Sequence, residues 1–413
     1  MKQLYFVLFI IFSVPASFVS AQVNTDSVFA IALSLSRNQQ YTSALEKAKL
    51  SIESDPTRAD ILVFIANLYS WQEQNEMALV YINKAHEMNY RHDDFYESWT
   101  NILLRSHQYE ALLLSCTEAE NNNYSKPVDL LRKRLIAYTE LKAYDKGISL
   151  IESPPNKKFL TDEAVDGLYT TLLLKRNTKI VSAYYTLDFF DSVPDPQHLA
   201  SLGYSFHVNK HSLGFRANYA NRFGMNDVQL ETDFYLLLKK KKYLYLNYGY
   251  SFNSSLFPEH RFGTEFYFNL FPKTDASIGG RYLIYTNSNV SIFTGHLGHY
   301  LGKNWVAIRP FYVWQKLSHS LSFIANYRHY SNSELDYWGL ELGFGNSPDD
   351  LFASSLNGRY NMLNSYKLKI ENNFTINRVS DLHVGLGYAS EEYSLNKFRN
   401  KYTVELGYKF RLK

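Results

Sequence analysis

The strongest constraint on the fold of this chain is a two-residue alternation of side-chain character in its second half. In residues 366–377, Tyr, Leu, Ile, Asn, Phe and Ile alternate with Lys, Lys, Glu, Asn, Thr and Asn. Successive side chains of a β-strand point to opposite faces, so such a segment has one largely apolar face and one polar face. Segments of about ten residues with this alternation are typical of outer-membrane barrels, although a soluble β-sandwich shows the same pattern.

The first residues of the chain favour the barrel, because they indicate export. Lys2 precedes an apolar stretch, and Val19-Ser20-Ala21 forms a small-residue cleavage site before Gln22. We therefore expect residues 1–21 to be a signal peptide, since the apolar stretch is short for a spanning helix of about 20 residues. No later apolar run reaches that length, so the mature chain could enter a membrane only as a closed barrel. The 16% aromatic content suits the aromatic girdles of such a barrel.

The last strand carries a second sign of a barrel. Its pattern of polar, x, Gly, apolar, x, aromatic, x, apolar is formed by Glu405, Gly407, Tyr408, Phe410 and Leu412. This pattern resembles the terminal signal by which the barrel-assembly machinery recognises outer-membrane proteins. The match departs from the usual ending in two ways, because the final position is leucine rather than an aromatic residue and a lysine follows it.

The alternation predicts an antiparallel transmembrane barrel of about 14 strands over residues 179–413, and merging two weaker segments would give 12. The segments start near Ile180, Leu199, Ser212, Val228, Tyr243, Arg261, Ala276, Val290, Asn304, Ser320, Tyr337, Tyr366, Leu382 and Arg399. An even number places both ends of the barrel on one side of the membrane. The longest connection, 346–364, would then be extracellular. Pro310 lies inside a segment and lacks a ladder donor, so we expect a β-bulge or a segment boundary there.

Residues 22–175 show a different, helical pattern with a repeat of 34 residues. This spacing separates Ala32 from Ala66 and Ala44 from Ala78. The period and the small residues resemble the tetratricopeptide repeat, with less regular third and fourth units after residues 109 and 143. Such repeats stack into a superhelix with a concave face, which could dock a periplasmic protein or a glycan, or could act as a spacer. We expect this helical domain to be periplasmic.

Several motifs of the barrel segment resemble those of a known family. They are Gly214-Phe215-Arg216, Asn221-Arg222-Phe223-Gly224, Gln229-x-Glu231-x-Asp233-x-Tyr235, Arg261-x-Gly263-x-Glu265, Gly279-Gly280-Arg281-Tyr282 and Gly298-x-Tyr300-x-Gly302-x-x-Trp305. On these motifs, residues 179–413 resemble the YaiO family of outer-membrane barrels. The resemblance implies a location in the outer membrane, in contact with its lipid, and it implies little about mechanism.

The charged residues of the barrel segment gather on the polar faces of their strands. The candidates for the lumen are Arg216, Arg222, Glu231, Asp233, Arg261, Glu265, Arg281, Arg309 and Arg328. On the lipid face, Lys or Arg would cost about 2–4 kcal/mol each near the membrane midplane, so we expect these residues to face inward. They could select an anionic or sugar-rich substrate, or they could form salt bridges inside the barrel. The mixture of both signs on adjacent segments favours salt bridges.

Composition and motifs exclude several classes of protein. The net charge of +3 gives no basis for a nucleic-acid partner. The single cysteine, Cys116, cannot form a disulfide within the chain, and we expect it to be buried in a helix. We find no hydrolase motif, no spacing of metal ligands and no cofactor motif. His296 and His299 are three residues apart in a strand, so they project to opposite faces and cannot share a metal.

These observations predict a non-enzymatic protein of the cell outer membrane that assists export or assembly of a surface glycan or another envelope component. This expectation rests on the architecture, in which helical repeats precede a barrel. Two alternatives remain open at this point. One is a barrel enzyme that modifies outer-membrane lipid or glycan, and the other is a structural scaffold whose repeats recruit a periplasmic partner.

Overall fold

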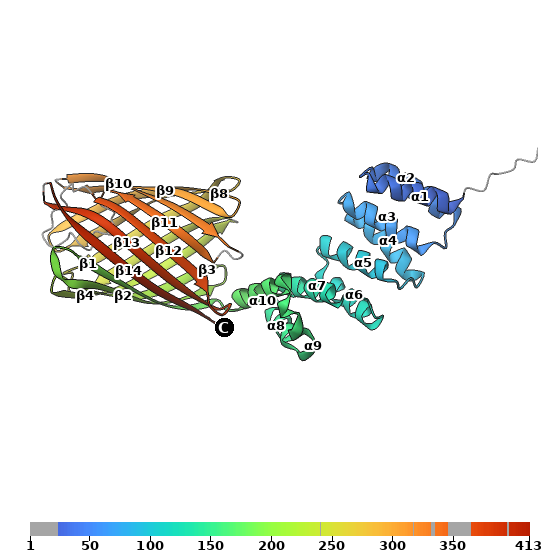
Figure 1. Cartoon of the computed structure of the whole chain (residues 1–413), viewed down its shortest axis with the longest axis horizontal. Helices are drawn as coiled ribbons and strands as arrows, with labels where there is room; N and C mark the ends of the chain where they lie inside the picture. The colour runs from blue at the N-terminus through green and yellow to red at the C-terminus, as the bar shows by residue number, and fades with distance from the viewer. Residues whose placement is uncertain (1–23, 240, 317, 332–334, 346–364, 395) are drawn as a thin grey trace, which may run out of the picture. The chain divides into compact units, whose positions relative to one another are not determined.

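The computed structural model describes residues 24–413 except 240, 317, 332–334, 346–364 and 395 (Figure 1). The predicted signal peptide and the predicted extracellular connection lie outside the described residues. Contacts divide the chain into two units, Met1–Tyr169 and Thr170–Lys413, and we describe each unit by itself.

The first unit consists of helix pairs that repeat along the chain. The first helices of the pairs are α1 (Thr25–Arg37), α3 (Ala59–Trp71), α5 (Asp93–Arg105) and α7 (Pro127–Glu140). The second helices are α2 (Tyr41–Ser54), α4 (Asn75–Glu87), α6 (Tyr109–Asn121) and α8 (Tyr144–Glu152), and α9 (Pro154–Lys157) and η1 (Lys158–Thr161) follow. The next helix, α10 (Glu163–Arg176), contains the boundary between the two units. The first helices start 34 residues apart throughout, so the repeat is more regular than the sequence indicates. Among the described helices, none has both the length and the apolar character needed to cross a membrane.

Small residues at the repeat spacing explain how the helices pack. Ala32, Ala66, Ala44 and Ala78 are all fully buried in one continuous core. Their short side chains let antiparallel helices approach closely, while larger aliphatic and aromatic residues fill the remaining space. Cys116 belongs to this core as a buried, free thiol.

The second unit is a closed antiparallel barrel of 14 strands (Figure 1), which confirms the predicted fold class and strand number. The strands are β1 (Lys179–Phe190), β2 (Val193–Val208), β3 (His211–Arg222), β4 (Met225–Lys239), β5 (Lys242–Ser251), β6 (His260–Phe271), β7 (Thr274–Tyr285), β8 (Ser288–Leu301), β9 (Asn304–Gln315), β10 (Ser318–Tyr330), β11 (Tyr337–Phe344), β12 (Ser365–Thr375), β13 (Ser380–Ser394) and β14 (Lys397–Leu412). Each strand pairs with its sequence neighbours, and β1 closes the barrel on β14 from Lys179↔Leu412 to Phe190↔Lys401.

The prediction of a β-bulge or a boundary at Pro310 was wrong. Pro310 lies in the middle of β9 and stands opposite Phe323 of β10. On the β8 side, the pairs Thr294↔Phe311 and Leu297↔Ile308 keep one register across the proline. The hydroxyl of Thr294 donates a hydrogen bond of 3.0 Å to the Pro310 carbonyl, so a side chain supports the ladder beside the missing donor.

Contacts between strands that are not neighbours identify the inner face of the barrel. Arg222 of β3 reaches Asp188 of β1 across β2, and Arg309 of β9 reaches Glu265 of β6 across two strands. Side chains from separated strands converge only on the concave side of a closed sheet. Residues of the opposite parity expose large apolar side chains outward, among them Leu202, Phe215, Leu230, Phe262, Ile278, Phe293, Trp314, Ile370, Leu386 and Leu406. The outer face is therefore suited to lipid.

Candidate functional site

One ion-pair network on the inner wall joins four of the predicted lumen residues. The guanidinium of Arg216 lies 2.5 Å from Glu231 and 2.9 Å from Asp233, which stand on the neighbouring strand β4. Arg261 of β6 lies 3.7 Å from the other oxygen of Glu231. The amide of Asn247 donates to both Glu231 (3.1 Å) and Asp233 (2.9 Å), which satisfies these nearly buried carboxylates.

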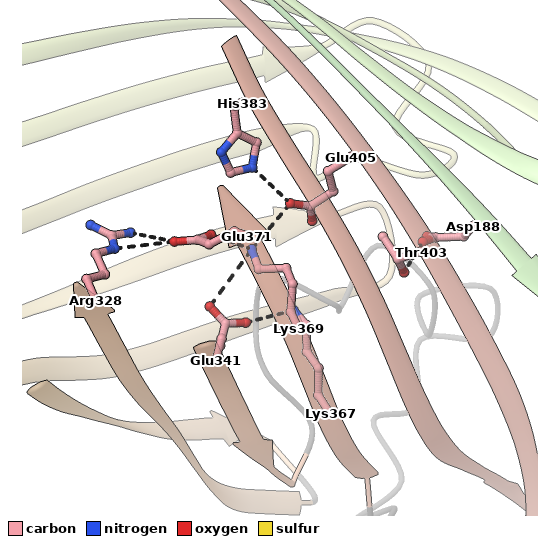
Figure 2. A network of polar contacts seen from close by, with 9 residues as sticks. All are labelled: Asp188, Arg328, Glu341, Lys367, Lys369, Glu371, His383, Thr403 and Glu405. Carbon is pink, nitrogen blue, oxygen red and sulfur yellow. Dashed lines mark hydrogen bonds and ion pairs between the residues drawn. The ribbon is translucent and has the colours of Figure 1, made fainter. Parts of the chain in front are cut away.

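A second network surrounds Lys369 on β12 (Figure 2). The ammonium of Lys369 lies 3.3 Å from Glu405, 3.4 Å from Glu371 and 4.0 Å from Glu341. Arg328 lies 3.1 Å from Glu371 and therefore extends the network to β10. Figure 2 also shows Lys367 against Glu341 and His383 against Glu405. Glu405, which the sequence singled out only within the terminal signal, is thus part of the lumen network.

A third cluster joins β3, β1 and β14 across the seam where β1 and β14 close the barrel. Arg222 lies 3.1 Å from Asp188, and the hydroxyl of Thr403 on β14 donates to the same carboxylate over 2.6 Å. Both members of the ion pair are buried. Arg222 therefore does not join the network of Arg216 as its shared parity suggested. Sequence reasoning missed Asp188, although its place between the outward-facing Leu187 and Phe189 marks it as inward-facing.

The remaining predicted residues have distinct surroundings. Arg281 lies in β7 on the inner face, opposite Gly263 of β6 and Ile292 of β8. In β14, Tyr408 donates from its hydroxyl to Ser380 over 3.0 Å, and Phe410 stands opposite Val181 of β1. Leu412 pairs with Lys179 at the end of the barrel. Gly407 lies against the ring of Tyr184, where an added Cβ would meet a ring carbon at 2.4 Å, so any larger residue there would have to displace this ring.

Glycines opposite charged residues shape the inner wall. A Cβ at Gly249 would meet Glu231 at 3.1 Å, one at Gly339 would meet Glu371 at 3.0 Å, and one at Gly385 would meet Glu405 at 2.9 Å. Because these positions carry no side chain, the long acidic side chains lie along the wall instead of projecting across the lumen. The same arrangement places ion-pair partners from alternate strands within reach of each other.

A fourth cluster was not found from the sequence. Nδ1 of His296 lies 2.7 Å from Oγ of Ser277, and Nε2 of His296 lies 2.6 Å from Asp275. The order Ser–His–Asp resembles a hydrolase triad. However, the hydroxyl of Ser277 donates its single proton to Glu265, which Arg309 holds at 2.9 Å. Ser277 is also buried, so its oxygen is neither activated by His296 nor presented to a substrate.

An open pocket of about 240 Å³ lies beside this cluster. Its walls include Tyr243, Tyr267, Asp275, His296, Trp305 and Asn326. Tyr243, Asp275 and Trp305 are each the second residue of an odd-numbered strand, so the pocket lies near the barrel end at which β1 begins. Rings of Tyr243 and Tyr267 stack with centroids 4.5 Å apart and planes at 10°.

At the opposite end of the barrel, apolar side chains pack on two parts of the inner wall. Leu283, Val290, Ile292, Phe311, Val313 and Ile324 form an inward-facing apolar cluster that is almost completely buried. On another part of the wall, Leu256 and Phe257 of the β5–β6 loop pack against Ala220. The backbone N–H groups of Leu256 and Phe257 donate to Asp227 over 2.8 and 2.9 Å, so this loop is tied to the inner face.

Among the residues that the structure describes, no group of three or more His, Cys, Asp or Glu is arranged so that it could hold a metal ion. The closed barrel, with its apolar outer face and polar inner face, defines an outer-membrane β-barrel protein whose N-terminal helices resemble tetratricopeptide-repeat proteins. Residues 178–350 match the family described as the YaiO membrane beta barrel domain, so the barrel contains a YaiO domain.

Solved structures with similar parts are distant in sequence. A bacterial polysaccharide outer membrane secretin is 8% identical, with a TM-score of 0.39 over 57% of this chain and 99% of that chain. The outer membrane protein Omp33 of Acinetobacter baumannii is 10% identical, with a TM-score of 0.36 over 57% and 98%. YrrB, a TPR protein with an unusual peptide-binding site, is 15% identical, with a TM-score of 0.28 over 36% and 84%. A comparison with curated proteins gave no match.

Proposed function

We propose that this protein is a non-enzymatic component of the cell envelope that assists export or assembly of a surface glycan. The observation that carries the proposal is the inner wall of the barrel, where the charges of the first three clusters and those of Arg309 and Glu265 are paired, and where an aromatic pocket opens near one end. A wall of paired charges offers many hydrogen bonds and little net charge. Such a surface suits a polymer rich in hydroxyl groups better than it suits an inorganic ion.

In this role, the helical repeats would bind the partner of the barrel. Because the strand number is even, β1 begins and β14 ends on the same side of the barrel, and the repeats precede β1. The turns at that end include the short connections 209–210, 272–273 and 302–303, as expected of periplasmic turns. We infer that the repeats are periplasmic and dock a protein or an emerging glycan on their concave face.

The test compares surface glycan in three strains. One strain carries the full chain, one lacks the protein, and one carries a chain without residues 24–162 that keeps the leader and the barrel. We expect lectin staining of intact cells to fall in the last two strains, with polymer accumulating in the periplasmic fraction. A strain carrying Trp338→Ala, an outward-facing substitution, serves as the control. Unchanged surface and periplasmic glycan in the strain that lacks the whole protein would reject the proposal.

A second candidate function, a lipid or glycan esterase, is favoured by one observation, the Ser277–His296–Asp275 chain. The experiment that decides is labelling of the folded barrel with a fluorophosphonate, which modifies an activated serine. We expect no labelling, because the Ser277 hydroxyl donates to Glu265. Labelling that disappears in Ser277→Ala would establish the enzyme instead.

A further inference from the structure

We propose that the pocket between β5 and β10 is a binding subsite for one ring of a neutral sugar. This inference rests on the proposed function and names the class of glycan that the barrel handles. The volume of about 240 Å³ is below the range of about 300–1,000 Å³ that is usual for drug-sized ligands, so it suits a single ring of a longer chain. The pocket is open, which allows neighbouring rings to extend along the lumen.

The aromatic walls of the pocket are held in fixed orientations. Tyr267 stacks on Tyr243 and also lies against the ring of His296, with centroids 5.6 Å apart. The indole N–H of Trp305 donates to Asp275 over 3.2 Å, and the guanidinium of Arg328 covers the same indole at 5.4 Å. A pyranose presents a face of C–H groups, which packs on an aromatic ring as an apolar surface. Rings that are already fixed lose little conformational entropy on binding.

Polar groups in the pocket match sugar hydroxyls. Asp275 accepts one hydrogen bond on each oxygen, from Trp305 and from His296, so a carboxylate with about four acceptor sites still has two to offer. The side chain of Asn326 is partly exposed and makes no hydrogen bond within the described part of the chain. Its amide can therefore both donate to a hydroxyl and accept from one.

The charges around the pocket favour a neutral sugar over a uronic acid. The guanidinium of Arg309 lines the pocket, and it already lies 2.9 Å from Glu265. Asp275 adds a carboxylate that is 30% exposed and faces the ligand position. A sugar carboxylate bound here would meet that charge and would compete with Glu265 for Arg309, whereas a neutral ring meets neither penalty.

The experiment is calorimetric titration of the full-length protein in a sugar-free detergent. The probes are maltohexaose, cellohexaose, laminarihexaose and mannohexaose as neutral chains, and hexagalacturonate as the anionic chain. We expect at least one neutral chain to bind and hexagalacturonate to bind at least tenfold more weakly. Trp305→Ala, Tyr267→Ala and Asn326→Ala should each weaken the neutral ligand at least tenfold. Trp338→Ala removes an outward-facing indole and should leave the affinity unchanged.

Heat-modifiable mobility on gels shows which variants have folded barrels, and Asn326→Ala tests the subsite with the smallest change in packing. The inference is overturned if no neutral chain binds at millimolar concentration, if hexagalacturonate binds more tightly, or if Trp338→Ala weakens binding as much as Trp305→Ala. Failure of the subsite can be told from failure of the proposed function. Loss of surface glycan without sugar binding rejects only the subsite, and sugar binding without any effect on surface glycan rejects only the role in export or assembly.

Discussion

At the scale of single residues, the buried pair of Arg222 and Asp188 should contribute strongly to barrel stability. Removing one member leaves the other charge buried without its partner, which typically costs about 3–5 kcal/mol. We expect Arg222→Ala to lower the unfolding midpoint of the folded barrel in urea. Arg216→Ala should have a smaller effect, because Arg216 is 38% exposed and Glu231 keeps Arg261 nearby. The exchange Arg222→Asp with Asp188→Arg should restore part of the loss, and an unchanged midpoint in Arg222→Ala would contradict this account.

The thiol of the single cysteine should not react with alkylating reagents in the folded protein. Cys116 has no exposed surface, and burial raises the pKa of its thiol to about 11. The thiolate, which is the reactive form, is therefore scarce at neutral pH. We expect no modification by iodoacetamide at neutral pH in the folded chain and full modification after denaturation, as measured by mass spectrometry. Modification of the folded chain at the rate of a free thiol would show that the α6 core opens readily.

At the scale of elements, the turns between paired helices hold residues in an unfavourable conformation. Glu73 follows α3 with a positive φ of 61°, and Gln39 and His107 occupy the equivalent positions 34 residues away. This conformation costs a residue other than glycine about 1–2 kcal/mol. Glycine avoids that cost, but it loses more backbone entropy on folding, which offsets roughly 0.5–1 kcal/mol of the stabilisation. We expect Glu73→Gly to stabilise the repeats by roughly 0.5–1 kcal/mol.

The measurement for Glu73→Gly is the urea midpoint of the helical circular-dichroism signal in the full chain. The matched control is Glu76→Gly, which lies in the first turn of α4. It should destabilise the repeats by up to about 1 kcal/mol, because glycine is a poor helix former. A lower midpoint in Glu73→Gly would show that the glutamate side chain has a stabilising role.

The terminal strand β14 should depend on its outward-facing aromatic residue. Phe410 stands between Val181 of β1 and Ser380 of β13, next to the closure of the barrel. We expect Phe410→Asp to yield unassembled chain that proteases degrade, since a charge replaces an apolar side chain within the assembly signal. Phe398→Asp, at the far end of the same strand, is the control outside that signal. Normal heat-modifiable mobility of Phe410→Asp would contradict an assembly role for this residue.

The positions of the strands could be predicted from the sequence, because a single rule, the alternation of side chains between two faces, determines them. Alternation located the strands, and most of them begin within a few residues of the predicted positions. β2 is the exception, since it begins at Val193 rather than near Leu199. Pro194 and Pro196 lie in this first part, beyond the pairs of β2 with β3, which begin at His198. The two prolines lack an N–H donor, but they interrupt no ladder hydrogen bond with β3. Whether a proline is tolerated here depends on where the neighbouring strand β3 ends, which the sequence around the prolines does not show.

The candidate site was predictable only in part, because alternation gives the face of a residue and not its height in the barrel. It placed Arg222, Glu231 and Asp233 on the same face as Arg216, but it could not show that Arg222 meets Asp188 instead. The contact between Arg309 and Glu265 joins residues 44 positions apart across two strands. Such a pairing follows from barrel closure and from the stagger of the strands, which are properties of the whole sheet.

At the scale of the whole molecule, the end of the lumen opposite the pocket should limit the conductance of the barrel. The pocket end is lined by polar and aromatic groups, whereas the other end holds the apolar cluster and the β5–β6 loop. We expect the full chain in planar bilayers to give small conductance steps, because packed apolar side chains exclude water and ions. Leu256→Ser with Phe257→Ser should release the loop from the wall near Ala220 and enlarge the steps. Serines at Leu202 and Phe215, on the outer face, are the matched control and should leave the steps unchanged. Large, steady steps in the unmodified protein, with no change in the loop variant, would mean that this packing does not restrict the lumen and that the barrel is a standing channel.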